Sequence, residues 1–362
     1  MGDKVVLAYS GGLDTSAAIR WIQEKHHMAV ITLTADLGGE KRNMEAIKEK
    51  SVSVGAEKAL VVDARELFVD HFVFRALQAG VLYEGQYPLA TALGRPLIAK
   101  MLVDAAAEEG AVAVAHGCTG KGNDQVRFDV SVSALAPGLR TIAPAREWGM
   151  SREETIAYAK KHGISVPVTV DSPYSIDENL WGRSIECGVL EDPWAEPPEE
   201  VFAWTRAPND APEKPCYVEI GFERGIPVSL DGKEMDGVRL VEELNKVAGE
   251  HGVGRIDHVE NRLVGIKSRE IYEAPAAVVL LAAHRALEAM TLSKQQVRFK
   301  ERVAAEYADL IYNGLWFTHF HQDLALYVAS TQRNVAGTVR VKLHRGGAVV
   351  VGRKSPKSLY SV

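Results

Sequence analysis

Cysteine is scarce in this sequence. Three cysteines occur among the 362 residues, at positions 118, 187 and 216. They lie far apart and none belongs to a Cys-x-x-Cys pair, so the pattern indicates neither a disulfide framework nor a zinc site. We therefore expect a protein of a reducing compartment, the cytoplasm, without a bound structural metal.

Long apolar runs and an excess of positive charge are also missing. The most apolar predicted helix, residues 275–290, is too short to cross a bilayer and contains His284, Arg285 and Glu288. The expected first strand begins by Val5, with no charged and then apolar signal region before it. The net charge of -6 disfavours nonspecific nucleic-acid binding, which depends on lysine and arginine neutralising phosphates. We expect neither a membrane nor a nucleic-acid partner.

The sequence does hold enough apolar material for more than one core. With 362 residues, of which 46% are hydrophobic and 25% charged, two or three domains are expected. In the first third, short apolar runs alternate with longer amphipathic ones, which is typical of an α/β fold with a doubly wound parallel sheet. The expected strands are 5–9, 28–33, 59–62 and 111–115, and the expected helices are 17–27, 43–54, 65–79 and 95–109.

Residues 5–16 hold the first candidate site. An apolar strand runs into the pair Gly11-Gly12, which allows a tight turn, and a helix follows. Free amides at a helix N-terminus, the helix dipole and nearby hydroxyls make a site for an anion, most plausibly phosphate. The loop lacks the lysine of a Walker A motif and has Asp14 instead. Beside a polyanion this acid must order the loop, bind magnesium or face a cation.

Residues 116–128 form the second candidate site, which we interpret as one glycine-rich loop. Three glycines in six positions let the backbone approach a ligand closely, and the polar residues include donors, an acid and two bases. A free amino acid needs such a mixture, because its carboxylate requires donors and its ammonium requires an acid such as Asp124. Since the carboxyl ends of parallel strands share one edge, the loops at Ser10, at Ala35-Asp36 and from His116 onward should line one crevice.

The string from Ser10 to Ser16 resembles the pyrophosphate loop of the N-type ATP pyrophosphatases, which split ATP between the α- and β-phosphates and adenylate a substrate oxygen. The longer string 8–16 resembles the argininosuccinate synthase family in particular, and similar motifs extend from Val5 to about Gly352. The resemblance implies a ligase that condenses citrulline and aspartate and releases AMP and pyrophosphate through a citrullyl-adenylate, a step of arginine biosynthesis.

The resemblance also assigns residues to three ligands. For ATP, taken with Mg²⁺, it implies Ala8, Tyr9, Ser10, Gly11, Gly12, Leu13, Asp14, Thr15, Ser16, Ala35 and Gly117, with Asp14 and Ser10 in catalytic roles. For aspartate it implies Thr119, Asn123 and Asp124. For citrulline it implies Tyr87, Thr91, Asn123, Arg127, Ser175, Ser184, Glu260 and Tyr272. At position 92 some family members have serine where this chain has alanine, so Thr91 is taken as the source of that hydroxyl. No general base is assigned.

The sequence pattern changes near position 168. We expect a nucleotide-binding domain over residues 1–167 and a second, α+β synthetase domain over 168–362 that binds the amino acids and forms the oligomer. Residues 193–215 hold six prolines and many acids and are expected to form an exposed excursion. Strands 216–222 and 226–230, a helix over 239–251, long helices from 275 to about 334 and a ribbon at 337–343 and 348–351 should follow.

Three further expectations concern assembly and alternatives. Family members usually carry a longer C-terminal tail that packs on neighbouring subunits, and the resemblance implies a homotetramer. His319 and His321 lie two residues apart on a predicted helix, so they point to different sides and are taken as structural. The alternatives are another ATP pyrophosphatase, such as a tRNA thiolase or an amidotransferase-coupled synthetase, and a nonenzymatic nucleotide-binding module.

Overall fold

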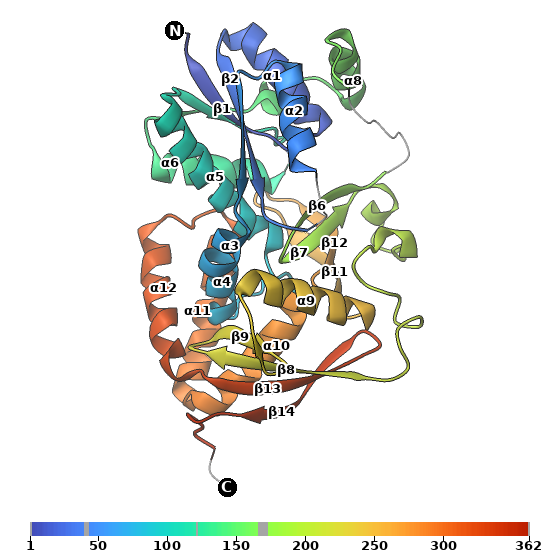
Figure 1. Ribbon diagram of the computed structural model, residues 1–362, viewed down its shortest axis with the longest axis vertical. Coiled ribbons are helices and arrows are strands. Elements are labelled where there is room, and N and C mark those ends of the chain that lie inside the picture. The colour runs from blue at the N-terminus through green and yellow to red at the C-terminus, as the bar shows by residue number, and fades with distance from the viewer. Residues whose placement is uncertain (1, 40–42, 121, 166–172, 361–362) are drawn as a thin grey trace.

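The computed structural model describes residues 2–39, 43–120, 122–165 and 173–360. The molecule is elongated, with an α/β domain at one end and a mixed domain at the other (Figure 1). The predicted boundary at 167/168 and Lys121 lie outside the described residues.

The α/β domain is built on a parallel five-stranded sheet in the order β3-β2-β1-β4-β5, which confirms the predicted fold class. The strands are β1 (Lys4–Ala8), β2 (Ala29–Asp36), β3 (Lys58–Asp63), β4 (Ala113–Ala115) and β5 (Arg140–Ile142). The sequence did not predict β5. The strand order reverses at β1, which is the topological switch point of the sheet: β2 and β3 extend to one side of β1, and β4 and β5 extend to the other. Ligands of such sheets bind at this switch point.

Helices cover both faces of this sheet, because alternate residues of each strand point to opposite sides. Val5 and Leu7 pack with Ile19 of α1, whereas Val6 packs on the other face with Leu102 of α5. The helices of the domain are α1 (Leu13–His26), α2 (Met44–Val54), α5 (Ala90–Glu109), α6 (Asn123–Leu135), α7 (Pro144–Glu147) and α8 (Arg152–Lys161). Ser151 and Glu154 form a capping box at the start of α8.

The chain between β3 and α5 leaves the sheet and packs on the second domain. It forms α3 (Arg65–Phe68), a π-helical turn (Val69–Val73) and α4 (Phe74–Ala79), which together fill the predicted helix 65–79. Phe68, Leu77 and Leu93 share one hydrophobic core with Leu240 and Tyr307 of the C-terminal half. The two halves of the chain are therefore joined by a common core, which fixes the position of the loops between them.

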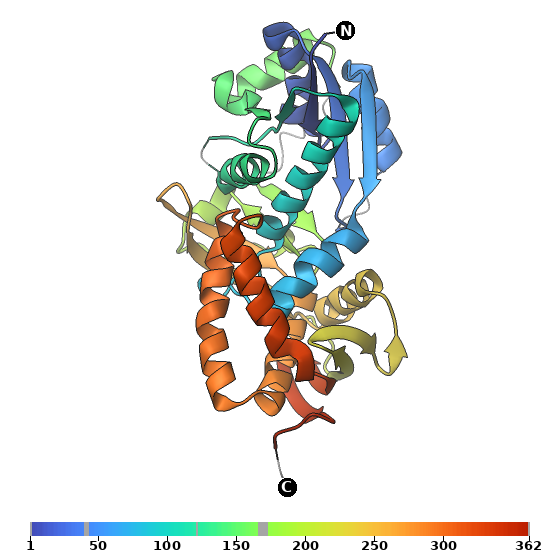
Figure 2. The same cartoon turned by 90° about the vertical axis from the view of Figure 1, so that its left-hand side faces the viewer.

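The second domain has two antiparallel sheets and four long helices. The four-stranded sheet, in the order β11-β12-β7-β6, contains β6 (Ser175–Asn179), β7 (Gly182–Glu186), β11 (Arg255–Asn261) and β12 (Lys267–Glu273). The five-stranded sheet contains β8 (Cys216–Glu223), β9 (Ile226–Leu230), β10 (Lys233–Glu234), β13 (Gly337–His344) and β14 (Gly347–Lys354). The helices are α9 (Gly237–Glu250), α10 (Pro275–Thr291), α11 (Lys294–Tyr312) and α12 (His319–Thr331), of which α11 and α12 run side by side up to the α/β domain (Figure 2).

The predicted excursion at 193–215 is wrong in part. Trp194 is 94% exposed, as expected, but Val201 and Thr205 are buried. The carboxylate of Glu273, which is 0% exposed, accepts hydrogen bonds from the backbone amides of residues 203–205. This segment therefore satisfies a buried charge at the end of β12, which its proline content could not reveal.

Candidate functional site

The predicted site residues gather around one cavity of about 620 Å³ between the two domains. The loops that follow β1, β2 and β4 form its upper wall, and the four-stranded sheet forms the opposite wall. Every predicted ligand-binding residue lines this cavity except Gly11 and Ser16. The volume lies in the range of small-molecule sites.

The loop after β1 presents an open helix N-terminus to the cavity. The helix α1 begins at Leu13 and not at residue 17 as predicted, because Gly12 is extended and acts as its N-cap. Gly12 provides no capping side chain, so the first amides of α1 remain available to a ligand. Gly11 has a φ of +78°, a conformation that favours glycine, and makes the turn possible. The start of α1 therefore has the free backbone amides that an anion site requires.

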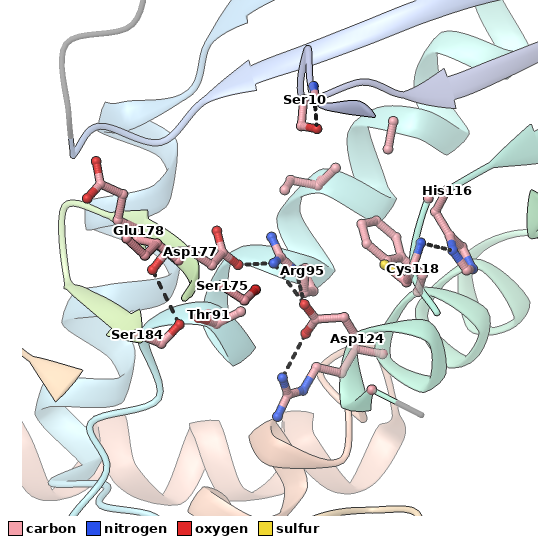
Figure 3. Close-up of a pocket in the computed structure, with 18 of the residues that line it drawn as sticks. Ser10, Thr91, Arg95, His116, Cys118, Asp124, Ser175, Asp177, Glu178 and Ser184 are labelled. Atoms are coloured by element: carbon pink, nitrogen blue, oxygen red, sulfur yellow. Dashed lines mark hydrogen bonds and ion pairs between the residues drawn. The ribbon is translucent and has the colours of Figure 1, made fainter. Parts of the chain in front are cut away.

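Side chains within this loop bond to one another. Ser10 Oγ lies 3.1 Å from Thr15 Oγ1 and accepts a hydrogen bond from the Gly12 amide at 3.3 Å. The predicted ATP residue Ser16 instead points into the core, where its hydroxyl lies 3.0 Å from that of Tyr9. The side chain of Ser10, which follows β1, faces the cavity (Figure 3).

A lysine reaches this loop from a distant element. Lys50 of α2 donates a hydrogen bond of 2.6 Å to the carbonyl of Gly11. Burial lowers the pKa of its ammonium. The sequence did not predict this contact, because Lys50 belongs to a charged helix with no motif that links it to the loop.

The Asp14 carboxylate is exposed at the cavity, in the first turn of α1. Desolvation raises its pKa, and the positive charge of Arg152 opposes that change. An acid at a helix N-terminus is favoured by the dipole but repelled by a bound phosphate. A cation between the two would remove that repulsion.

The second candidate loop is shorter than predicted. Residues 116–128 are not one loop, because α6 begins at Asn123, directly after the extended residue Gly122. Asn123 and Asp124 therefore lie in its first turn and Arg127 one turn later on the same side. The guanidinium of Arg127 bonds to the Asp124 carboxylate at 2.8 Å.

The carboxylate of Asp124 also meets Arg95, which the sequence reading missed. Arg95 of α5 bonds to Asp124 Oδ2 at 2.8–2.9 Å and to Asp177 of β6 (Figure 3). Burial alone would raise the pKa of Asp124, but the two guanidinium groups hold it below its usual value. This ion network links both domains across the cavity.

The four-stranded sheet turns a polar face to the cavity. Ser184 on β7 pairs with Asp177 on β6 and with Tyr272 on β12, so all three side chains point to the same side. Ser175 lies on that side too, two positions before Asp177. The predicted convergence of Ser175 and Ser184 thus results from the β6–β7 hairpin. Alternation along four neighbouring strands gives the wall its polarity.

Glu260 of β11 is the buried acid of this wall. It is 2% exposed and accepts hydrogen bonds from the hydroxyls of Tyr272 at 2.6 Å and Tyr312 at 2.5 Å. Burial raises the pKa of both tyrosines well above the usual value, so they remain donors. Tyr87 stacks on Tyr272 with ring centroids 4.1 Å apart. Glu260 is therefore held rigidly at the cavity and does not belong to a surface salt bridge.

Position 91 supplies a hydroxyl at the cavity and position 92 does not. Thr91 lines the cavity, and its amide donates to the Tyr87 hydroxyl at 3.0 Å. Ala92 is fully buried in the core.

Three further charged residues line the cavity beside Glu260 and were missed by the sequence reading. The Arg262 guanidinium contacts the carboxylates of both Glu186 and Glu270. Burial and the neighbouring Glu186 raise the pKa of Glu270 to about 8. These residues follow no spacing rule, because a hairpin turn and a strand pairing bring them together.

The cysteine and histidines discussed for reactivity or metal binding have local partners in the fold. Burial raises the pKa of the Cys118 thiol to about 12, so it is not a thiolate at neutral pH. His116 accepts the Cys118 amide on Nδ1 at 3.2 Å and faces Asp129 through Nε2 at 3.3 Å, which orients the loop. In the described ranges no group of three His, Cys, Asp or Glu side chains is arranged to hold a metal ion. His321 is buried against Tyr307.

Among the helices of the described segments, none is both long and apolar enough to span a bilayer.

An open helix N-terminus at the switch point of a parallel sheet, facing a cavity lined with paired charges, defines a nucleotide-using enzyme of the α/β class. The N-terminal HUP domain of argininosuccinate synthase matches residues 4–165, and the C-terminal domain of argininosuccinate synthase matches residues 174–362. The chain belongs to the argininosuccinate synthase family, whose members are ATP-dependent ligases of arginine biosynthesis. The resemblance stated from the sequence is confirmed.

Individual relatives agree with the family match. The chain is 64% identical over 360 residues to an argininosuccinate synthase of Dehalococcoides mccartyi strain 195, covering 99% of this chain and 88% of the relative. It is 61% identical over 360 residues to that of Gloeobacter violaceus, covering 99% and 90%. A solved NAD+ synthetase of Burkholderia pseudomallei is 17% identical with a TM-score of 0.33, covering 48% of this chain and 64% of that chain.

Proposed function

We propose that this cavity condenses citrulline with aspartate to argininosuccinate, splitting ATP to AMP and pyrophosphate through a citrullyl-adenylate. The observation that carries the proposal is that one cavity holds both an open helix N-terminus and a wall of polar and charged side chains of the kind that suits amino acids. A phosphate and two zwitterions can therefore meet within it. Family membership supports the same reaction.

ATP would bind with its β- and γ-phosphates at the start of α1. The amides of the first turn and the hydroxyls of Ser10 and Thr15 would donate to the phosphate oxygens. Gly117 lies against Thr15, and a Cβ added to it would stand 2.8 Å from the Thr15 methyl group, so this close approach requires glycine. The remaining predicted contacts are to the nucleotide, including Ala35 beside the adenine or ribose and the backbone of Ala8, Tyr9 and Leu13.

Mg²⁺ would lie between Asp14 and the phosphates. The exposed carboxylate at the phosphate site supports this, because its charge opposes that of ATP unless a cation intervenes. Magnesium commonly uses one or two protein carboxylates and several phosphate and water oxygens, so a complete cage of protein ligands is not required. When bound, the ion would neutralise charge on the leaving pyrophosphate.

Citrulline would bind along the sheet wall. The buried carboxylate of Glu260 suits its ammonium, since a buried charge requires an opposite charge. Arg127 suits its carboxylate, with hydroxyls from the same wall completing the contacts. Those hydroxyls belong to Tyr87, Thr91, Ser175, Ser184 and Tyr272.

Aspartate would bind at the start of α6. Thr119 and Asn123 would donate to its carboxylates, and its ammonium would join the ion network of Asp124, Arg95 and Arg127. Because Asp124 and Arg127 bond directly to each other, the aspartate and citrulline positions share a charge network.

The chemistry would depend on positioning and charge stabilisation. Adenylation converts the ureido oxygen of citrulline into part of a good leaving group, and the aspartate amine then displaces AMP at the ureido carbon. Because one cavity holds all three reactants, reactions between separate molecules become unimolecular steps within a single complex. Ser10 and the α1 amides would stabilise the charge that develops on the phosphates.

Turnover with each substrate omitted in turn tests the proposal. We expect pyrophosphate only when citrulline and ATP are both present. AMP and argininosuccinate, in equal amounts, should appear only when aspartate is added as well, because the AMP group stays bound in the citrullyl-adenylate until the aspartate amine displaces it. Binding of ATP without pyrophosphate release would indicate a nucleotide-binding module instead. ADP as the product would contradict the proposal.

We further propose a homotetramer in the cytoplasm, as the family resemblance implies. Light scattering after size-exclusion chromatography measures the assembly, and a monomer at micromolar concentration would contradict the tetramer.

A further inference from the structure

We propose that Tyr312 is a positioning residue for both amino-acid substrates, through which the last turn of α11 holds Asn123, Arg127 and Glu260 in place. The inference rests on the proposed roles of those three residues. Tyr312 is 1% exposed and lies behind the cavity wall, so it acts through other side chains.

The backbone of Tyr312 holds Arg127. Its carbonyl, at the C-terminal end of α11, accepts a hydrogen bond of 2.8 Å from Arg127 Nε. The C-terminus of a helix carries partial negative charge and free carbonyls, which favour a guanidinium. The Arg127 guanidinium also lies 4.7 Å from the centre of the Tyr312 ring, within cation–π range.

The hydroxyl of Tyr312 joins Asn123 to Glu260. Asn123 Nδ2 donates to the Tyr312 oxygen at 2.8 Å, and the Tyr312 hydroxyl donates to Glu260 Oε1 at 2.5 Å. The amide of Leu263 donates to Asn123 Oδ1 at 2.9 Å, which fixes the orientation of the Asn123 side chain. Because Asn123 Oδ1 accepts from Leu263, Asn123 Nδ2 must be the donor to Tyr312, and the Tyr312 hydroxyl must donate to Glu260.

The packing around Tyr312 allows it little freedom. Its ring stacks on Tyr83 with centroids 3.6 Å apart and an interplanar angle of 6°. Gly314, which follows it, has a φ of +76°, and a Cβ there would lie 2.7 Å from the Arg127 Cα. The end of α11 therefore sits directly against α6, where the proposed aspartate and citrulline positions meet.

Tyr312→Phe tests the proposal, because it removes the two hydrogen bonds and keeps the ring. The matched control is Tyr307→Phe, five residues earlier on α11, where the hydroxyl of an equally buried tyrosine bonds to His321 at 2.8 Å. For Tyr312→Phe we expect the KM for citrulline and for aspartate to rise about tenfold, in line with the loss of hydrogen bonds to a charged group. The KM for ATP should stay within about twofold, and Tyr307→Phe should leave all three unchanged at a similar melting temperature.

Equal changes in all three KM values, or the same kinetics in both variants, would overturn the proposal. An inactive wild-type protein would instead contradict the proposed function, so the two failures are distinguishable. If Tyr312→Phe does not fold, 3-fluorotyrosine at position 312 replaces it, with position 307 as control. Its fluorine resonance should shift with citrulline and not with ATP alone, and an unchanged resonance would overturn the proposal.

Discussion

The carboxylate of Asp14 is exposed at the start of α1, beside the proposed phosphate position, so we expect it to serve ligands and not the core. We expect Asp14→Ala to lower kcat about a hundredfold, because the charge balance around the leaving pyrophosphate is lost. Stability should change by no more than about 0.5 kcal/mol, as for other exposed positions. Steady-state kinetics and thermal unfolding measure both.

Asp70→Ala provides the control, because Asp70 is also exposed but lies on the π-helical turn away from the cavity. It should keep wild-type turnover. Wild-type turnover in Asp14→Ala as well would remove the proposed role of Asp14.

Glu270 makes stability depend on pH. Its pKa is raised to about 8 in the folded protein from a usual value of 4.5, so between these values the folded state holds a proton that the unfolded state has lost. The stability of the wild type therefore falls as pH rises through this window, by at most about 1.4 kcal/mol per pH unit.

Glu270→Gln removes this titration and keeps an oxygen that can accept from Arg262. The melting temperature of the variant relative to the wild type should therefore be higher at pH 8 than at pH 5. A difference that does not change with pH would show that Glu270 keeps an ordinary pKa.

Single residues also mark the limit of what the sequence could predict. Asp124 and Arg127 were recognisable because they lie together in a motif, but their bond to each other depends on a helix starting at Asn123. Arg95, Lys50 and Tyr312 lie in helices with no such motif, far from their partners in sequence. Only tertiary packing brings them to the site.

At the scale of elements, the loop after β2 must accept the β6–β7 hairpin. Gly38 has a φ of +76°, and a Cβ there would stand 2.3 Å from Leu180. Gly85 has a φ of +77° with no atom within 4 Å of such a Cβ, so an alanine there would carry the same backbone strain without the clash. Gly38→Ala should therefore destabilise by about 1–3 kcal/mol more than Gly85→Ala. Thermal or urea unfolding of the two variants measures this.

Equal destabilisation of the two variants would mean that Leu180 moves aside and that the hairpin is not closely seated on the loop.

Most helices and strands could be predicted from the periodicity of apolar residues. The errors occur at helix starts, where glycine and polar residues also fit a loop, and at a very short strand. The helix α1 begins earlier than expected and the helix α6 was not predicted, because each is preceded by an extended glycine, Gly12 or Gly122, and starts with residues that were interpreted as loop. The short edge strand β5 has only three residues, too few for an alternation signal.

At the scale of the whole molecule, the α/β class was predictable because parallel sheets need alternating buried strands and amphipathic helices. The arrangement of the second domain was not. Residues such as Phe68 and Leu93, from the first half of the chain, complete its core, and no local pattern indicates which distant helices they meet. The cavity forms where this shared core ends.

In the proposed mechanism, the α1 N-terminus holds pyrophosphate as the leaving group while citrulline attacks the α-phosphorus. Citrulline labelled with heavy oxygen at the ureido position tests this directly, with mass spectrometry of the products. We expect label in AMP, with unlabelled pyrophosphate and unlabelled argininosuccinate. Label in free phosphate, or ADP as the nucleotide product, would mean transfer of the γ-phosphoryl group and would contradict it.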